Sequence, residues 1–228
     1  SLLTPTNPYS ASKAGAEMLV MAYGRSYDLP FIITRGNNVY GPGQYPEKAI
    51  PKFSILASTG QKLSIHGDGL ATRSYMHVSD AASAFDVILH HGELLHIYNI
   101  GAHEERTVLS VAHDICTIVG RNSKEAITHV RDRAFNDRRY FIDCSKLLAL
   151  GWKQRKSWEQ GLNETVQWYC TEDLSSYWEH YTTALQAHPL TMGSCLTFSR
   201  KNSSISFRTD TNETGASKAT FLIYGRTG

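Results

Sequence analysis

The chain of 228 residues is 41% hydrophobic and 19% charged, with a formal net charge of +2. This composition excludes a collagen-like, coiled-coil or wholly disordered protein, and no apolar run approaches the roughly 20 residues that a membrane-spanning helix needs. Residues 1–189 hold 18 basic and 19 acidic side chains, so we expect neither a nucleic acid nor a membrane as partner.

Helices and strands alternate along most of the chain. Apolar residues at helical spacing, with Pro8 suited to a first turn, predict a helix over 9–27, and the β-branched run 31–34 predicts a strand. A strand end at 39–40 runs into a glycine-rich loop. Further helices are predicted over 49–58, 79–91 with Ser79 as N-cap, 109–119 ended by Gly120, 145–150 and 158–169, and strands over 63–66, 73–78, 97–100, 127–130 and 140–142. This alternation is typical of an α/β fold with a parallel sheet.

The composition changes near residue 190. Ser, Thr, Asn and Gly make up 15 of residues 190–218, which predicts a flexible linker. Residues 219–228 have the pattern of a buried strand that enters a Gly-x-x-Gly turn, as a dinucleotide-binding βα unit does. We therefore expect a first domain over 1–189, a linker over 190–218, and the first strand of a second Rossmann domain over 219–228.

The four cysteines indicate a reducing compartment. Cys116, Cys144, Cys170 and Cys195 are far apart and form no C-x-x-C pair. Their spacing predicts no metal site and no disulfide framework. A cytoplasmic location suits this pattern, with Cys116 and Cys144 buried as small apolar residues.

Tyr9 and Lys13 are the first candidates for catalysis. Positions i and i+4 share a face of a helix, so the Lys13 ammonium can lie near the Tyr9 hydroxyl. A positive charge there favours the phenolate form, which a general base requires. The same spacing also arises by chance as an ordinary surface pair, so the surrounding sequence is needed to distinguish a catalytic pair from a chance one.

The residues around this pair resemble a known family. The run NPYSASKAGAE at 7–17 is similar to the catalytic helix of extended short-chain dehydrogenases/reductases, and more closely to that of nucleotide-sugar 4,6-dehydratases. The resemblance covers about residues 4–189 and is nearest to the dehydratase half of plant-type UDP-rhamnose synthases. It continues through RGNNVYGP at 35–42, PEKAIP at 46–51, IHGDG at 65–69, RSY at 73–75, YNIG at 98–101, DR at 132–133, DRRY at 137–140, LGW at 150–152 and WEQGL at 158–162.

This resemblance implies a Rossmann-like fold with a substrate-binding lobe and an NAD-dependent hydro-lyase. Such an enzyme oxidises C4 of UDP-glucose or dTDP-glucose, removes water across C5–C6 and returns hydride to C6, which gives a 4-keto-6-deoxy sugar for UDP-rhamnose formation. By the same resemblance, Tyr9 takes the proton of the C4 hydroxyl, and Lys13 binds the nicotinamide ribose and tunes Tyr9. Val39 meets the nicotinamide through its backbone.

Five further residues are expected, from the resemblance, to bind the nucleotide sugar. Asn38 contacts the substrate, with a plain turn residue as the alternative, and Lys48 faces the diphosphate, with a solvated loop lysine as the alternative. Arg73 and Arg133 suit a diphosphate because a guanidinium is a permanently charged, bidentate donor, although a salt bridge to a neighbouring aspartate is also open. Asn136 matches a polar contact to the nucleotide.

Two parts of the family's site have no counterpart in the sequence. Neither a strand–Gly-x-x-Gly-x-x-Gly–helix unit nor an Asp-Glu acid/base pair precedes Tyr9. We therefore expect an incomplete portion of a longer enzyme, with negligible turnover by itself. For the full-length parent, the resemblance allows a homodimer.

Two other functions stay open at this point. One is a different nucleotide-sugar epimerase or decarboxylase of the same superfamily, which shares Tyr9, Lys13 and the substrate lobe. The other is a non-catalytic remnant that at most binds a nucleotide sugar. The sequence does not distinguish a uridine from a thymidine nucleotide.

Overall fold

A computed structural model describes residues 4–102, 104–132, 139–140, 142–186 and 222–226. The helices are α1 (Pro8–Tyr27), α2 (Ala49–Ser58), α3 (Val78–His91), α4 (Val108–Val119), α5 (Ser123–Ala126), α6 (Ser145–Ala149), α7 (Trp158–Thr171) and α8 (Tyr181–Ala184), with a 3-10 turn η1 (Leu174–Ser176). The strands are β1 (Ile33–Asn37), β2 (Val39–Tyr40), β3 (Leu63–His66), β4 (Thr72–Ser74), β5 (Met76–His77), β6 (Ile97–Ile100), β7 (Glu105–Thr107), β8 (Ile127–Val130), β9 (Arg139–Tyr140) and β10 (Leu222–Arg226).

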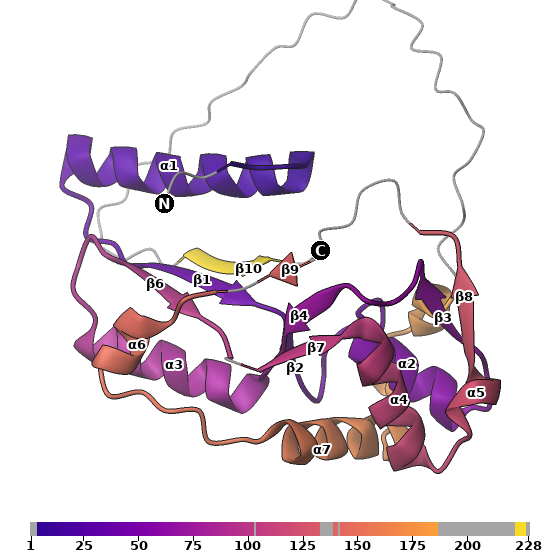
Figure 1. The fold of residues 1–228 in the computed structure, drawn as a ribbon. Helices are drawn as coiled ribbons and strands as arrows, with labels where there is room; N and C mark the ends of the chain where they lie inside the picture. The colour runs from indigo at the N-terminus through magenta and orange to yellow at the C-terminus, as the bar shows by residue number, and fades with distance from the viewer. Residues whose placement is uncertain (1–3, 103, 133–138, 141, 187–221, 227–228) are drawn as a thin grey trace, which may run out of the picture.

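A parallel sheet forms one half of the molecule. Strand β1 lies in its middle and pairs in parallel with β6 on one side and β10 on the other. Helix α1 covers one face of this sheet, while α3 and α6 cover the other (Figure 1). A parallel sheet covered on both faces buries its strands, which explains the continuous apolar run that leads into β1. The predicted α/β class is confirmed.

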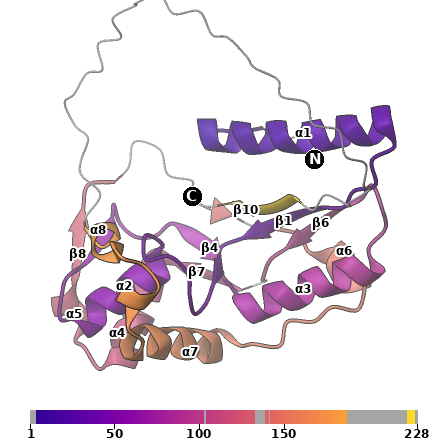
Figure 2. The same cartoon turned by 180° about the vertical axis from the view of Figure 1, so that it is seen from behind.

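The other half gathers helices around short strand pairs. Figure 2 shows α2, α4, α5 and α8 close to β8, with α7 below them. Strands β3 and β8 pair in parallel, as do β2 and β5, and β4 lies between β7 and β9 in a mixed sheet. The predicted linker over 190–218 lies outside the described residues.

Each half has its own hydrophobic core. On the sheet side, Ile88 of α3, Ile100 of β6 and Leu147 of α6 are almost fully buried in one cluster. In the other half, Ile115 of α4 and Leu162 of α7 belong to a second cluster. The two halves are joined by Asp80 near the start of α3, whose buried carboxylate accepts backbone N–H groups of the segment before α7. A buried carboxylate without such donors would be strongly destabilising, so this contact fixes the junction.

Two sequence-based expectations about the middle of the chain are wrong. The strand over 73–78 is broken at Tyr75, because β4 joins the mixed sheet while β5 pairs with β2. Ser79 is not the N-cap of α3: His77 holds that position, and its side chain accepts the Ser79 N–H. Strand β7, helices α5 and α8 and the turn η1 were not anticipated, since each spans only three or four residues.

Helix α1 meets the sheet along a narrow line of small or polar residues. Its buried residues are Ser10, Glu17 and Gly24, spaced seven apart on one face of the helix. At Gly24 the approach is tight, because a Cβ built there would lie 2.3 Å from Cε1 of Phe31. Gly15, on the same helix, has nothing within 4 Å of the corresponding position.

We expect Gly24→Ala to lower the free energy of unfolding by about 1–3 kcal/mol, because the forced movement of the buried Phe31 ring outweighs the better helix propensity of alanine. Gly15→Ala is the matched control, and it should raise the free energy of unfolding by up to about 1 kcal/mol. Urea denaturation measures both. Equal stabilisation by the two substitutions would show that α1 does not pack against Phe31.

Candidate functional site

The Tyr9–Lys13 pair lies in the first turns of α1. The helix begins at Pro8, and the Asn7 side chain caps it by accepting the Ser10 N–H at 2.8 Å. The Lys13 ammonium lies 5.7 Å from the centre of the Tyr9 ring, and Tyr9 is 40% exposed. The predicted helical face therefore exists, with the cation beside the ring and the tyrosine accessible to a ligand.

A buried ion pair anchors this helix to the central strand. Glu17, only 3% exposed, accepts from Arg35 of β1 at both carboxylate oxygens: Arg35 Nε donates to Oε2 at 3.0 Å and Nη2 donates to Oε1. Two parallel hydrogen bonds between a guanidinium and a carboxylate fix orientation as well as distance. The position of Tyr9 and Lys13 above the sheet therefore depends on this contact.

Asn38 and Val39 lie directly after the carboxyl end of β1. Asn38 has a φ of 34°, in the left-handed region that few residues other than glycine adopt. Its carbonyl accepts the Met76 N–H at 3.3 Å, which joins the start of β2 to β5. Carboxyl ends of strands in open α/β sheets are where ligands bind, and a strained backbone is frequent at such sites.

Lys48 follows in the same segment, immediately before α2. Its ammonium lies 2.9 Å from a carboxylate oxygen of Glu47, and one third of the side chain is exposed. A cation held by one exposed neighbour can exchange it for a ligand phosphate at little cost, because exposed ion pairs are weak.

Arg73 comes from the middle strand of the mixed sheet. It is only 8% exposed, its Nη1 donates to the Thr72 carbonyl at 2.9 Å, and its cross-strand partner is Arg106 of β7. Burial raises the pKa of nearby Tyr75 to about 12, and the charge of Arg73 opposes that rise. Arg106 is itself ion-paired with the carboxylates of Glu104 and Glu159, so the two neighbouring arginines do not give this sheet a net positive charge.

The predicted residues thus come from three parts of the fold. The structure brings Tyr9 and Lys13 together on α1, Asn38, Val39 and Lys48 into one segment, and Arg73 onto β4. Arg133 and Asn136 lie outside the described residues. The sequence reasoning missed Glu17, although an acidic residue two helical turns beyond Tyr9 in an otherwise small and apolar stretch is a signal for a buried ion pair.

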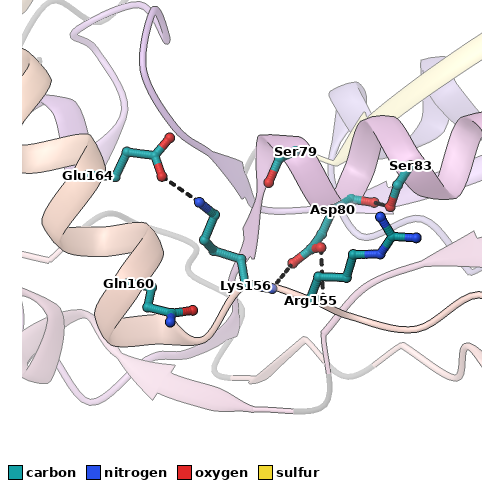
Figure 3. A pocket seen from close by; sticks show the side chains of 7 residues that line it. All are labelled: Ser79, Asp80, Ser83, Arg155, Lys156, Gln160 and Glu164. Carbon is teal, nitrogen blue, oxygen red and sulfur yellow. Dashed lines mark hydrogen bonds and ion pairs between the residues drawn. The ribbon is translucent and has the colours of Figure 1, made fainter.

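A polar pocket of about 600 Å³ lies apart from these residues, between the N-terminal ends of α3 and α7. Figure 3 shows the Asp80 carboxylate turned towards the backbone of Arg155 and Lys156, each N–H at 3.0 Å, and the Lys156 ammonium bonded to Glu164 at 2.6 Å. None of the predicted site residues lines this pocket. Its polar groups instead tie α3 to α7.

His77 is buried beside this junction. Its Nδ1 accepts the Ser79 N–H, and its Nε2, which lies 3.9 Å from Glu164, has no hydrogen-bond partner among the described residues. Burial lowers the pKa of His77, because the charged form loses its solvation, and the carboxylate of Glu164 opposes this shift. The imidazole is therefore neutral at pH 7.

The sequence of this chain is similar to those of known proteins. The sequence matches the family described as GDP-mannose 4,6 dehydratase over residues 1–165. A trifunctional UDP-glucose 4,6-dehydratase/UDP-4-keto-6-deoxy-D-glucose 3,5-epimerase/UDP-4-keto-L-rhamnose-reductase of Arabidopsis thaliana is 50% identical, over 100% of this chain and 36% of that protein.

Solved structures agree with the sequence match. The dTDP-glucose 4,6-dehydratase of Bacillus anthracis in complex with NAD superposes with a TM-score of 0.73 at 44% identity, over 79% of this chain and 56% of that one. The UDP-glucose 4-epimerase of Thermotoga maritima with UDP-glucose gives a TM-score of 0.69 at 28% identity, over 73% of this chain and 54% of that one.

The parallel sheet, its covering helices and these structural neighbours define a Rossmann-like fold of the extended short-chain dehydrogenase/reductase type. Within that class, the chain belongs to the GDP-mannose 4,6 dehydratase family, so the resemblance drawn from the sequence is confirmed. The chain spans about half the length of the dehydratase structure and about a third of the Arabidopsis protein.

Within the described part of the chain, no helix has the length and apolar character that crossing a membrane requires. The same residues contain no group of three or more His, Cys, Asp or Glu side chains that could hold a metal ion. Cys116 and Cys144 are buried free thiols, as predicted.

We expect Glu17→Gln to lower the free energy of unfolding by about 3 kcal/mol, because it leaves the Arg35 guanidinium without its buried counter-charge. Glu179→Gln is the control, since Glu179 is 88% exposed and should leave the unfolding midpoint unchanged. Urea denaturation followed by tryptophan fluorescence compares the two. Equal midpoints for the two variants would contradict the anchoring role of the Glu17–Arg35 pair.

The buried, neutral His77 predicts a pH dependence of stability. Its pKa in the folded state lies below the unfolded value of about 6.5, so the unfolded state binds the extra proton, and stability is lost as the pH falls below about 6.5. His77→Asn keeps a helix-capping side chain but should remove part of this loss between pH 7.5 and 5.5. His113→Asn, at an exposed position of α4, should retain the wild-type loss. If His77→Asn lost as much stability between pH 7.5 and 5.5 as the wild-type chain, a group other than His77 would cause the pH dependence.

Proposed function

We propose that this chain carries the base tyrosine and the nucleotide-sugar-binding part of an NAD-dependent UDP-glucose 4,6-dehydratase, and that the whole enzyme supplies the 4-keto-6-deoxy sugar for UDP-rhamnose formation. The observation that carries this proposal is the Tyr9–Lys13 pair on a helix fixed to the central strand, inside the region matched by the dehydratase family. The 50% identity to the Arabidopsis protein favours uridine over thymidine as the base.

NAD suits the residues present on α1. Tyr9 is accessible and Lys13 lies beside it, so the hydroxyl and the ammonium can both reach the ribose and nicotinamide end of a dinucleotide. When bound, NAD accepts and returns a hydride. In this proposal Tyr9 acts as the phenolate, which takes the proton from the C4 hydroxyl of the sugar and becomes the neutral phenol. Lys13 stabilises the phenolate before the transfer and binds the ribose. In the same proposal the backbone of Val39, the first residue of β2, would contact the nicotinamide.

The substrate residues come from the two other parts of the site. Asn38 binds the sugar, and Lys48 exchanges Glu47 for the diphosphate. Arg73 is the strongest of these assignments, because its guanidinium is a permanently charged, bidentate donor of the kind that a diphosphate requires. Arg133 and Asn136 complete the nucleotide site in this proposal.

We also propose a domain organisation for this chain. Residues 1–189 form the dehydratase portion, 190–218 a linker and 219–228 the beginning of a second Rossmann domain, which agrees with a relative that aligns along the whole chain. The longer protein is a cytoplasmic homodimer. The apolar side chains exposed on α1 support such a contact, because a patch of this kind favours burial by a partner: Met18, Leu19, Tyr23 and Tyr27.

A nucleotide-sugar epimerase is the second candidate. It is favoured by the structural similarity to the Thermotoga maritima UDP-glucose 4-epimerase. The family resemblance implies that an epimerase would share Tyr9 and Lys13. Product analysis separates the two, because dehydration gives a 4-keto-6-deoxy sugar while epimerisation leaves the hexose intact.

We expect the purified chain to bind UDP-glucose in calorimetry and to show no turnover with UDP-glucose and NAD, whereas a longer protein containing it should release the 4-keto-6-deoxy sugar. Arg73→Lys should weaken UDP-glucose binding by roughly tenfold or more, since it replaces a bidentate donor with a point charge.

Arg25→Lys is the control, at an exposed position near the end of α1, and it should bind like the wild-type chain. A folded wild-type chain that binds no UDP-glucose would favour a non-catalytic remnant. An unmodified hexose as the product of the longer protein would favour the epimerase.

A further inference from the structure

The segment Asn38–Lys48, called here the substrate loop, is held by side chains that no step of the proposed reaction uses. The Gln44 side-chain amide donates to the Val39 carbonyl at 2.8 Å and so closes the loop on itself. The Tyr169 hydroxyl, from α7, donates to the Gln44 carbonyl at 2.5 Å and lies 3.5 Å from the Gly41 carbonyl. Tyr169 thus connects α7 to the backbone of the loop, while Gln44 closes the loop internally.

We propose that Gln44 and Tyr169 are positioning residues that fix the substrate loop and thereby set the affinity for the sugar end of the substrate. This inference rests on the proposed function, because it takes Asn38 and Lys48 as the residues of the loop that contact the nucleotide sugar. Neither Gln44 nor Tyr169 touches the ligand in this proposal. Both act through the backbone that carries the contacting residues.

The loop needs external support because its backbone is not relaxed. Asn38 has a φ of 34°, in the left-handed region, whereas Gly43, with a φ of 77°, adopts that region without strain. At a residue other than glycine such a conformation persists only when the surroundings hold it. The bond from Gln44 to the Val39 carbonyl acts on the residue next to Asn38 and opposes its relaxation.

Tyr169 is suited to hold the loop from the outside. Its side chain is only 3% exposed, at the C-terminal half of α7, and burial raises the pKa of the phenol well above its usual range. The hydroxyl therefore remains protonated and able to donate across the working pH range. Tyr169 packs with Ile55 of α2 and Leu174 of η1 in a third, smaller cluster, and α7 itself is packed into the second core through Leu162. The donor is therefore fixed in space.

Residues that follow α7 also contact the substrate loop and helix α2. The ring of Trp178 packs edge-on against Tyr45 of the loop, with centroids 5.9 Å apart. The Lys52 ammonium donates to the carbonyls of Ala184 at 3.1 Å and Gln186 at 2.7 Å, which ties the segment after η1 to α2. The substrate loop is thus held internally by Gln44 and from outside by Tyr169 of α7 and Trp178 beyond it.

The test uses the whole 228-residue chain and two variants that each remove one donor, Gln44→Met and Tyr169→Phe. We expect faster hydrogen exchange at backbone amides of residues 38–48 in both, measured by mass spectrometry without ligand. In calorimetry, UDP-glucose should bind about tenfold more weakly, whereas uridine monophosphate, which lacks the sugar end, should bind within twofold of wild type. A purely structural role would weaken both ligands alike.

Matched controls separate these effects from general destabilisation. Tyr177→Phe removes a hydroxyl that donates to the surface carboxylate Glu172 at 3.4 Å, and Gln154→Met removes an amide that donates to the Lys156 carbonyl at an exposed position. Both should match the wild-type chain in exchange and in binding. Unchanged exchange in Gln44→Met and Tyr169→Phe, or an equal loss for both ligands, would overturn the positioning role. A wild-type chain that binds neither ligand would instead overturn the proposed function and the role in affinity with it.

Discussion

The bidentate contact between Glu17 and Arg35 is the interaction on which the candidate site depends. The fully buried residues of helix α1 are small or polar, so its attachment to the sheet depends strongly on this ion pair and on the tight packing of Gly24 on Phe31. An ion pair of this kind has a fixed geometry, whereas apolar contacts tolerate sliding. A base that must reach one hydroxyl of a sugar is better held by a directional contact.

The strain at Asn38 and the support given by α7 belong together. The end of β1 has to turn sharply into β2, and the left-handed conformation of Asn38 makes that turn. The hydrogen bonds from Gln44 and Tyr169 then determine the path of the following residues, so the geometry of one part of the site is set by a helix about 130 residues further along the chain. The second hydrophobic core therefore acts on the site, although no residue of that core need touch a ligand.

The sequence predicted local elements better than it predicted connections between them. Helix α2 and strands β3, β6 and β8 lie where their apolar patterns place them, because each is decided by its own residues. The break at Tyr75 and the capping role of His77 were missed, since both depend on which distant strand pairs with β4 and β5. The same reason hid Glu17, Gln44 and Tyr169 as contributors to the site: their partners are 18, 5 and 125 residues away, and only a folded chain shows them together.

The inner and outer faces of α1 carry different kinds of side chain. The inner face needs small residues and one acid to approach the sheet closely, so it can bury little apolar surface. The outer face keeps Leu19, Tyr23 and Tyr27 exposed, although a helix whose purpose was only to cover a sheet would turn such side chains inward. The exposed apolar side chains are the reason for the homodimer proposed above. Tyr9 and Lys13 therefore lie on a helix whose inner face is set by one directional contact and whose outer face would be covered in that dimer.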